Sequence, residues 1–131
     1  MRSAHDVATV RSAEAALMAT VPEGELMQRA ASGLARTCAS VLRAERGGVY
    51  GARVCLLVGA GNNGGDALFA GALLRRRGAQ VTAVLLADGA HASGLLALRR
   101  SGGRVVASTD IGADAHVRRA DIVVDGIVGI G

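Results

Sequence analysis

The chain has 131 residues, enough for one domain with a hydrophobic core and too few for two. Half of the residues are hydrophobic but only 2% are aromatic, so we expect a core of small aliphatic side chains, which suits helices packed on a parallel sheet. The formal net charge is +4 and every basic residue is an arginine, a balance that permits an acidic partner. With only one tyrosine and one phenylalanine to offer base stacking, we expect no nucleic-acid ligand.

No stretch of the sequence is typical of a membrane anchor or a secretory signal. No apolar run is long enough to cross a bilayer, and the start of the chain lacks a continuous apolar core. The two cysteines, Cys38 and Cys55, fall in apolar stripes without the spacing of metal ligands, and we expect both to be buried as small hydrophobic residues. These features predict a cytoplasmic protein with no membrane partner.

The N-terminal part of the chain, residues 1–50, is predicted to be helical. A first helix is expected from Thr9 or Ser12 to about Ala19, because apolar residues recur there on one helical face. A longer helix is expected over residues 26–42, where apolar residues recur at three- and four-residue intervals until a pair of glycines ends the pattern. One face of this second helix should therefore be buried.

Residues 51–131 are predicted to form a βαβ core. Short apolar strands alternate with helical segments, a pattern that implies right-handed crossovers and a Rossmann-like three-layer α/β/α fold with a mainly parallel sheet. Because the sequence stops inside a glycine-rich loop, we expect the domain spanning 1–131 to be incomplete at its C-terminal end. The expected strands are 54–58, 81–86, 104–107 and 121–124, and the expected helices are 67–77, 92–101 and 111–119.

The most informative stretch is 54–66, which reads VCLLVGAGNNGGD. An apolar strand, a glycine-rich turn and a helix follow one another, an order that presents unpaired N–H groups and the positive end of a helix dipole to an anion such as phosphate. We expect Gly64 to take a positive φ or to allow close approach of a ligand, so that Gly64→Val abolishes binding and leaves the fold largely intact. The alternative is that the glycines serve only tight packing of strand against helix.

Oxygen-bearing side chains gather at the predicted carboxyl ends of two strands. Asn62 and Asn63 carry carbonyl oxygens that accept hydrogen bonds or coordinate a hard cation. Asp66 is either a stabiliser of the N-terminus of its helix or an acid–base group. Asp125 follows four buried positions, where an unpaired carboxylate is costly, and this favours a functional role. The carboxyl ends of parallel strands share one edge of a sheet, so these groups can meet at one crevice.

Two other functions fit the same residues. Residues 59–64 satisfy the G-x-G-x-x-G pattern, and Asp88 stands where NAD(P)-dependent oxidoreductase domains carry a ribose-binding acid, although we favour its interpretation as the first residue of a turn. A non-catalytic nucleotide-binding or interaction module is the other alternative. We expect the histidines, His91 among them, on the surface, and we expect the arginine runs to complement the dipoles at helix C-termini.

Several segments resemble the NAD(P)H-hydrate epimerase family, also called the YjeF N-terminal domain. Residues 59–86 resemble its hallmark segment, residues 26–31 its second helix, and residues 121–131 its DxxxDAxFGTG-type strand and loop. The resemblance covers most of the chain. The chain departs from the family pattern at Ala67, where the family usually has glycine, and at Gly126, where it usually has alanine.

The resemblance implies an isomerase that interconverts the R and S forms of hydrated NADH and NADPH, written NAD(P)HX, in nicotinamide-cofactor repair. It also implies a potassium ion and, in many bacteria, fusion to an ADP- or ATP-dependent dehydratase domain that is similar to sugar kinases. The family's later region supplies further site residues, so we expect this chain alone to epimerise slowly or not at all. An incomplete sheet exposes a strand edge, and we therefore expect a homo-oligomer. By resemblance, Asn62, Asn63, Gly64, Gly65, Asp66, Gly129, Ile130 and Gly131 would contact the dinucleotide substrate, Asn63 and Asp125 would hold potassium, and Asp66 is the candidate catalytic residue.

Overall fold

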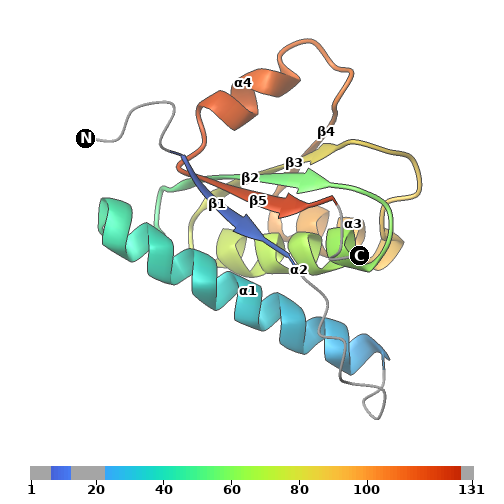
Figure 1. The fold of residues 1–131 in the computed structure, drawn as a ribbon, viewed down its shortest axis with the longest axis horizontal. Coiled ribbons are helices and arrows are strands. Elements are labelled where there is room, and N and C mark those ends of the chain that lie inside the picture. The colour runs from blue at the N-terminus through green and yellow to red at the C-terminus, as the bar shows by residue number, and fades with distance from the viewer. Residues whose placement is uncertain (1–6, 13–22, 128–131) are drawn as a thin grey trace.

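The computed structural model describes residues 7–12 and 23–127 and shows an α/β fold built on one sheet (Figure 1). Five parallel strands are arranged in the order β1-β5-β2-β3-β4. The strands are β1 (Ala8–Arg11), β2 (Arg53–Val58), β3 (Gln80–Leu85), β4 (Arg104–Ala107) and β5 (Ile122–Gly126). The helices are α1 (Glu23–Arg46), α2 (Asn62–Arg76), α3 (Ala92–Ser101) and α4 (Ala113–Arg118).

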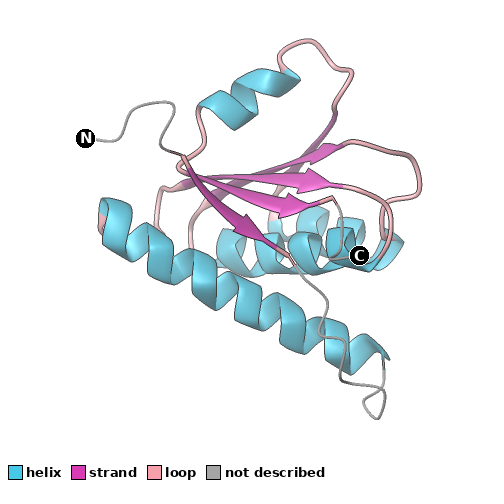
Figure 2. Ribbon diagram, in the orientation of Figure 1, coloured by secondary structure: helices cyan, strands magenta, loops and turns pink. Residues whose placement is uncertain are grey.

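The helices form two layers, one on each face of the sheet. Helices α1, α2 and α3 cover one face, and α4 stands on the other (Figures 1 and 2). The predicted Rossmann-like three-layer α/β/α fold with a parallel sheet is therefore confirmed. The main core fills the layer between the sheet and α1, α2 and α3. A smaller core on the α4 side contains Cys55, Val84, Ala120 and Val123.

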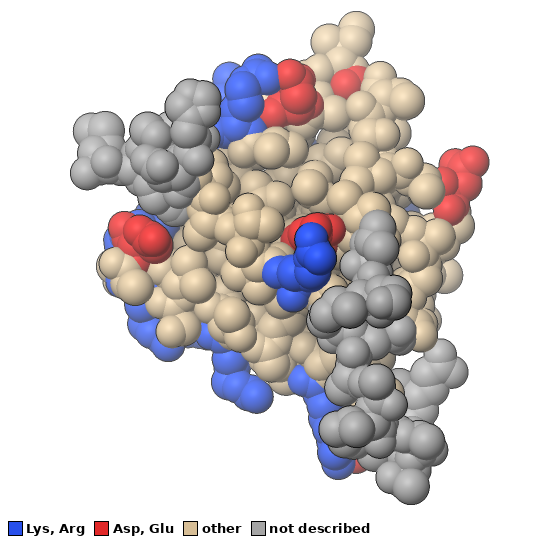
Figure 3. Space-filling view, in the orientation of Figure 1, with Lys and Arg blue, Asp and Glu red and all other residues tan. Residues whose placement is uncertain are grey.

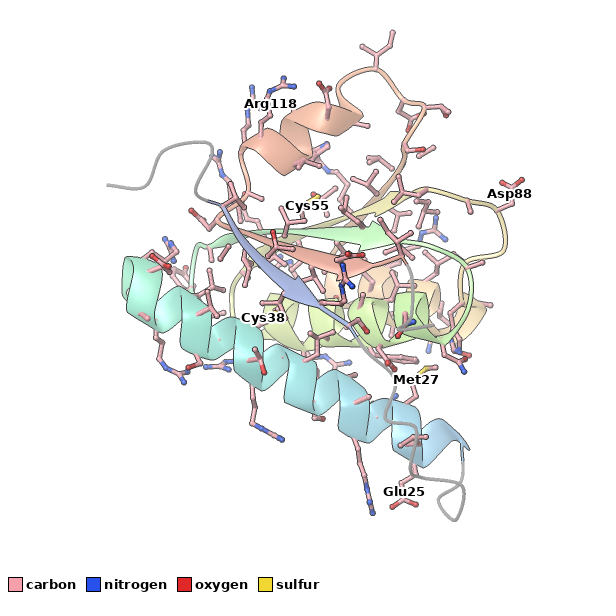
Figure 4. The ribbon with its side chains drawn as sticks, in the orientation of Figure 1. Glu25, Met27, Cys38, Cys55, Asp88 and Arg118 are labelled. Atoms are coloured by element: carbon pink, nitrogen blue, oxygen red, sulfur yellow. The ribbon has the colours of Figure 1, made fainter. Side chains whose placement is uncertain are left out.

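The central strand β2 is buried on both faces because its side chains alternate between the two cores. Leu56 and Val58 join the main core, and Cys55 joins the smaller one. Cys38, on α1, belongs to the main core, so the two thiols lie on opposite sides of the sheet (Figure 4). Both are buried as predicted, and this burial raises the pKa of Cys38 to about 12 and that of Cys55 to about 11.

The prediction for the N-terminus is wrong where the structure describes it. Residues Ala8–Arg11 form an edge strand that pairs in parallel with β5, in place of a helix that starts at Thr9. Thr9 and Val10 are β-branched and favour an extended backbone. The edge of β5 also offers the segment a partner, whereas a short isolated helix is marginal in water. The rest of the expected first helix lies outside the described residues.

The other elements lie where they were predicted, but two boundaries differ in ways that shape the site. Helix α2 begins at Asn62, so residues 62–66 belong to the helix and do not form a loop before it. Strand β5 continues to Gly126, so Asp125 lies within the strand and not after it. The arginines predicted at helix ends are confirmed in the last turns of α2 and α3, which contain Arg75 and Arg76, and Arg99 and Arg100.

Candidate functional site

The glycine-rich turn and the end of β5 meet at the carboxyl edge of the sheet. Val58 of β2 lies opposite Gly126 of β5, and the Gly59 N–H donates a hydrogen bond to the Gly126 carbonyl oxygen at 3.2 Å. Helix α2 starts from the same edge, at the right of the view in Figure 1. Two segments far apart in the sequence therefore lie side by side, as expected for neighbouring parallel strands.

Three glycines at this edge have no room for a side chain. A Cβ at Gly64 would sit well under 3.0 Å from the carbonyl oxygen of Gly59, and a Cβ at Gly59 would lie 2.8 Å from that of Ile127. A Cβ at Gly126 would lie 2.8 Å from the Cβ of Ala67. These glycines therefore allow β2, β5 and α2 to pack closely, which is the packing role that the sequence left open.

The expectation for Gly64 is corrected by this geometry. Gly64 does not have a positive φ; the φ of +92° belongs to Gly61, the N-cap residue of α2. Because a Cβ at Gly64 meets backbone, the prediction that Gly64→Val leaves the fold largely intact is wrong. The first N–H groups of α2, from Asn62 to Gly64, precede the first intrahelical bond, in which the Gly65 N–H donates to the Gly61 carbonyl oxygen at 3.2 Å, and Gly61 offers no side chain to cap them.

Two polar side chains of α2 are buried at this edge. Asn63 is 7% exposed and Asp66 is 3% exposed. Within the described part of the chain, Oδ1 of Asn63 has no hydrogen-bond partner, a cost that a ligand or a cation would remove. Asp66 lies beyond the first turn of α2, which contains no acidic residue, so Asp66 is not the dipole stabiliser that the sequence left as an alternative.

Asp125 projects from the opposite face of the sheet to α2. Val124 points into the main core, so its neighbour Asp125 points to the α4 side. The Asp125 carboxylate accepts a hydrogen bond from the Ile127 N–H at 3.1 Å and lies 3.6 Å from the guanidinium of Arg11. Asn63 and Asp125 can therefore share an ion only at the rim of the sheet, beyond the last residues of β5.

Ser12 completes the β5 end of the site and was not predicted from the sequence. Its side chain is buried, and its N–H donates a hydrogen bond to the carbonyl oxygen of Asp125 at 2.9 Å. Its Oγ has no hydrogen-bond partner among residues 7–12 and 23–127. Only the pairing of β1 with β5 brings Ser12 here, and a local pattern interpreted as helix conceals that pairing.

A pocket of about 350 Å³ opens between α1 and the start of α3, where its lining residues Met27 and His91 cover Gly65. Met27 reaches the N-terminal end of α2 from α1 (Figure 4), and a Cβ at Gly65 would lie 3.0 Å from both Met27 Cε and the His91 ring. Phe69 meets His91 edge to face, with ring centroids 5.8 Å apart. His91 Nδ1 accepts the Gly94 N–H at 3.1 Å, so a neutral ring carries its proton on Nε2.

His91 therefore belongs to the wall of the site and not to the outer surface. It is half-buried and serves as the N-cap residue of α3. Sequence reasoning missed it because a single histidine in a loop carries no pattern. Asp88, by contrast, is exposed on the loop after β3 (Figure 4) and lines a separate hollow of about 510 Å³ at the ends of β3 and β4.

Three of the predicted site residues fall outside the part of the chain that the structure describes. Gly129, Ile130 and Gly131 lie outside the described residues. Among residues 7–12 and 23–127, no helix is long and apolar enough to cross a membrane. In the same residues, no group of three or more His, Cys, Asp or Glu side chains is arranged to hold a metal ion.

Comparison with known proteins matches the chain to one family. The sequence model of the family described as YjeF-related protein N-terminus matches residues 23–131. The chain is 50% identical over 131 residues to the bifunctional NAD(P)H-hydrate repair enzyme Nnr of Mycobacterium tuberculosis. This alignment covers 99% of this chain and 26% of that protein. It is 43% identical over 130 residues to the NAD(P)H-hydrate epimerase of Microbacterium testaceum, and this second alignment covers 98% of this chain and 47% of that protein.

A solved structure shows the same fold. The crystal structure of yeast ynu0 matches with a TM-score of 0.66 at 23% identity, over 83% of this chain and 48% of that chain. The chain thus spans about a quarter of the bifunctional relative and about half of the epimerase. The family match includes the glycine-rich turn, α2 and β5, and it begins after Arg11 and Ser12.

Proposed function

Because the chain belongs to the family described as YjeF-related protein N-terminus, we propose that it binds hydrated NADH and NADPH and interconverts their R and S epimers in the cytoplasm. The observation that carries the proposal is the meeting of β2, β5 and the N-terminus of α2 at one edge, where Asn63 and Asp66 are buried. The names of longer relatives point to the same substrate.

Backbone N–H groups would hold the anionic part of the dinucleotide. The first turn of α2 has N–H groups without intrahelical partners, and the helix dipole favours negative charge at the same place. Phosphate oxygens bind readily in this arrangement because both effects act together. The substrate contacts that we propose are Asn62, Asn63, Gly64, Gly65 and Asp66, joined by Gly129, Ile130 and Gly131.

The reaction requires acid–base help at the carbon that carries the hydroxyl group. Inversion there means that a bond to this carbon breaks and forms again from the other side, with one proton delivered to the leaving group and one withdrawn from the returning group. We propose Asp66 for this exchange because its carboxyl is buried at the edge. Low local polarity strengthens the control of charge on the ring.

The residues at the rim of the sheet fit a potassium ion. Oδ1 of Asn63 is buried without a hydrogen-bond partner in the described residues, and Asp125 supplies a carboxylate from the neighbouring strand end. Amide and carboxylate oxygens are suitable ligands for a hard cation. When bound there, potassium would offset negative charge near the substrate phosphates. Arg11 lies 3.6 Å from Asp125 and competes for the same carboxylate.

The pocket beside Gly65 is the proposed seat of the nicotinamide ring. Its wall contains Met27, Phe69 and His91, which offer apolar surface and one ring N–H. A mostly apolar cavity with a few polar groups is typical of sites for small ligands. The nicotinamide ring would then contact Met27 and His91, whose side chains cover Gly65.

The direct test is an NMR assay of R-to-S exchange on hydrated NADH. We expect measurable exchange with a protein extended to the length of the epimerase relatives, and a loss of about a hundredfold or more in that protein with Asp66→Asn, because general acid–base catalysis contributes about 10²–10⁴ in rate. Asp88→Asn is the matched control, since Asp88 is an exposed carboxyl on a loop.

Each outcome distinguishes between the candidate functions. Loss of exchange with Asp66→Asn but not with Asp88→Asn supports the epimerase. Tight binding of intact NAD that depends on Asp88 would instead support an oxidoreductase domain. Binding of NAD(P)HX without turnover, even in the extended protein, would reduce the role to that of a binding module.

We also propose that the protein forms a homo-oligomer. Among the described residues, β1 and β4 are the outer strands of the sheet, so each has a strand partner on one side only. An open strand edge favours pairing with another chain. Light scattering coupled to size-exclusion chromatography measures the mass directly, and a monomer at all concentrations would contradict this proposal.

A further inference from the structure

A second cavity, of about 340 Å³, lies at the amino edge of the sheet, opposite the glycine-rich turn. Strand β2 spans the sheet from Arg53 to Val58, so the two sites are about 17 Å apart, at roughly 3.3 Å per residue. Four arginines and a histidine line this cavity, and no acidic residue does. The lining residues that carry the argument are Arg53, Arg75, Arg104, Arg119, Gln80 and Thr82.

The strand register explains how these side chains converge. Arg53 opens β2, Gln80 opens β3 and Arg104 opens β4. Arg53 lies beside Gln80, and Thr82 lies beside Arg104. All four side chains point to the α4 face, because the residues that alternate with them belong to the main core or pack against it. Two arginines thus flank β3 on one face, two strand spacings across the sheet and two residues along it, which places their Cα atoms about 12 Å apart.

Neutral hydrogen-bonding groups fill the space between the two arginines. Gln80 and Thr82 both project from β3, and they supply an amide and a hydroxyl. Arg119 borders the cavity from the segment after α4, and Arg75 borders it from the last turn of α2. The arginine side chains can therefore reach one ligand from three sides, and Gln80 and Thr82 supply neutral donors from the strand beneath it.

Ordinary structural roles do not account for this convergence. A helix-end role explains Arg75 and also Arg119, the C-cap residue of α4, but Arg53 and Arg104 begin strands and have no helix dipole to complement. The carboxylate of Asp121 accepts the backbone N–H of Arg53 at 2.8 Å and lies 3.7 Å from Nε of Arg46, and Asp121 does not line the cavity. Basic side chains are also spread over α1 and α4 (Figure 3), so positive charge alone does not single out the cavity.

We propose that this cavity binds a small molecule that carries two adjacent phosphate groups. Guanidinium groups recognise phosphate by paired, charge-assisted hydrogen bonds, and several arginines around one ligand offset the repulsion that they otherwise feel. The cavity volume is at the lower end of the range for small-molecule sites, which suits a diphosphate group with little more attached. The site is separate from the glycine-rich turn, so both can be occupied at once.

The test is a titration of the isotope-labelled chain with inorganic pyrophosphate, followed by NMR. We expect saturable shifts of the backbone amides of Gln80, Thr82, Gly102 and Arg104. A second titration with ADP shows whether a nucleoside on the diphosphate is accepted as well. Shifts confined to residues 61–65 would place the anion at the glycine-rich turn and would overturn the proposal. Failure of pyrophosphate to shift either region would overturn it too.

Variants identify the arginines responsible. Arg104→Gln and Arg119→Gln should each weaken pyrophosphate binding by at least about tenfold, because each removes a charge-assisted hydrogen bond to phosphate. Arg36→Gln is the matched control, since Arg36 is an exposed arginine on α1 that does not line the cavity. An equal loss with Arg36→Gln would mean that only net charge attracts the anion. Arg119 follows α4 and is exposed, so its replacement keeps the test valid if Arg104→Gln fails to fold.

Discussion

Replacing Gly64 with alanine should destabilise the whole fold, although the change adds only one methyl group. The new Cβ would sit well under 3.0 Å from the carbonyl oxygen of Gly59 and 3.2 Å from Cγ1 of Val58. The first of these contacts is with backbone, so relief requires the start of α2 to move away from the end of β2. Overpacking of this kind costs roughly 1–3 kcal/mol.

Replacing glycine with alanine stabilises a helix where the new methyl group has space, and this gain reduces the net cost of Gly64→Ala. Glycine within a helix costs about 0.5–1 kcal/mol relative to alanine, which offsets part of the overpacking. The two ranges leave a net cost of about 0–2.5 kcal/mol, and because the clash is with backbone we expect Gly64→Ala to lower the free energy of unfolding by roughly 1–2.5 kcal/mol. Gly33→Ala on α1 is the matched control, because the nearest atom to its Cβ is a side-chain nitrogen 3.9 Å away, and it should raise that free energy by roughly 0.5–1 kcal/mol.

Urea denaturation of the two variants and the parent measures both effects. The midpoint should fall for Gly64→Ala and rise for Gly33→Ala, with similar denaturant slopes because little surface changes. If Gly64→Ala is as stable as Gly33→Ala, the close packing of α2 on β2 is not what requires glycine at this position. The glycine would then have to be explained by ligand contact alone.

Two further perturbations probe the thiols and the proposed ion site. The raised pKa of Cys38 and of Cys55 means that the native state holds both thiol protons more tightly than the unfolded chain, so this stability is fully present below the ordinary thiol value of 9.0 and is lost as pH rises through about 11 to 12. Denaturation measured between pH 8 and about 10.5 should show this decline, and Cys38→Ala should flatten it. Arg11→Ala should raise the affinity for potassium about two- to fivefold, since the ion pair that competes for Asp125 is worth up to about 1 kcal/mol. The measurement is the thermal unfolding temperature of both proteins as a function of potassium concentration. If Asp125 is not a ligand, the substitution will leave this potassium dependence unchanged.

The sheet and one half of the site follow from local sequence patterns. The apolar run of β2, the glycines after it and the helical pattern of α2 are contiguous, so the unit was predictable from residues 54–77 alone. The neighbouring position of Asp125 also followed, because parallel strands present their carboxyl ends at one edge. The exact start of α2 was harder to predict. Asparagine and glycine have low helix propensity, and tertiary packing overrides that propensity here.

The missed features depend on contacts between distant residues. Thr9 and Val10 became a strand only because β5 offered an edge more than a hundred residues away in the sequence, and Ser12 was buried as a consequence. His91 entered the site because its Nδ1 caps α3 while its ring packs against Gly65. No local periodicity encodes such contacts, which is why a single sequence does not reveal them.

Ala67 and Gly126 face each other, and this contact explains why both positions depart from the family pattern together. In the family pattern that the sequence resembles, these two positions are glycine and alanine, whereas this chain has alanine and glycine. A Cβ at Gly126 would lie 2.8 Å from the Cβ of Ala67, so the space between β5 and α2 holds one methyl group and not two. Moving the methyl from one side to the other keeps the packing close to constant.

This interpretation predicts a non-additive pair of substitutions. Gly126→Ala alone should cost roughly 1–3 kcal/mol by overpacking, and Ala67→Gly alone should cost about 1 kcal/mol through the helix. The double variant should be more stable than the sum by at least about 1 kcal/mol, because the methyl clash is gone. Part of the cost should remain, since a Cβ at Gly126 also lies 3.0 Å and 3.1 Å from the carbonyl oxygens of Asn63 and Leu57. Urea denaturation of the four proteins gives the coupling energy directly, and strict additivity would show that the two departures are independent.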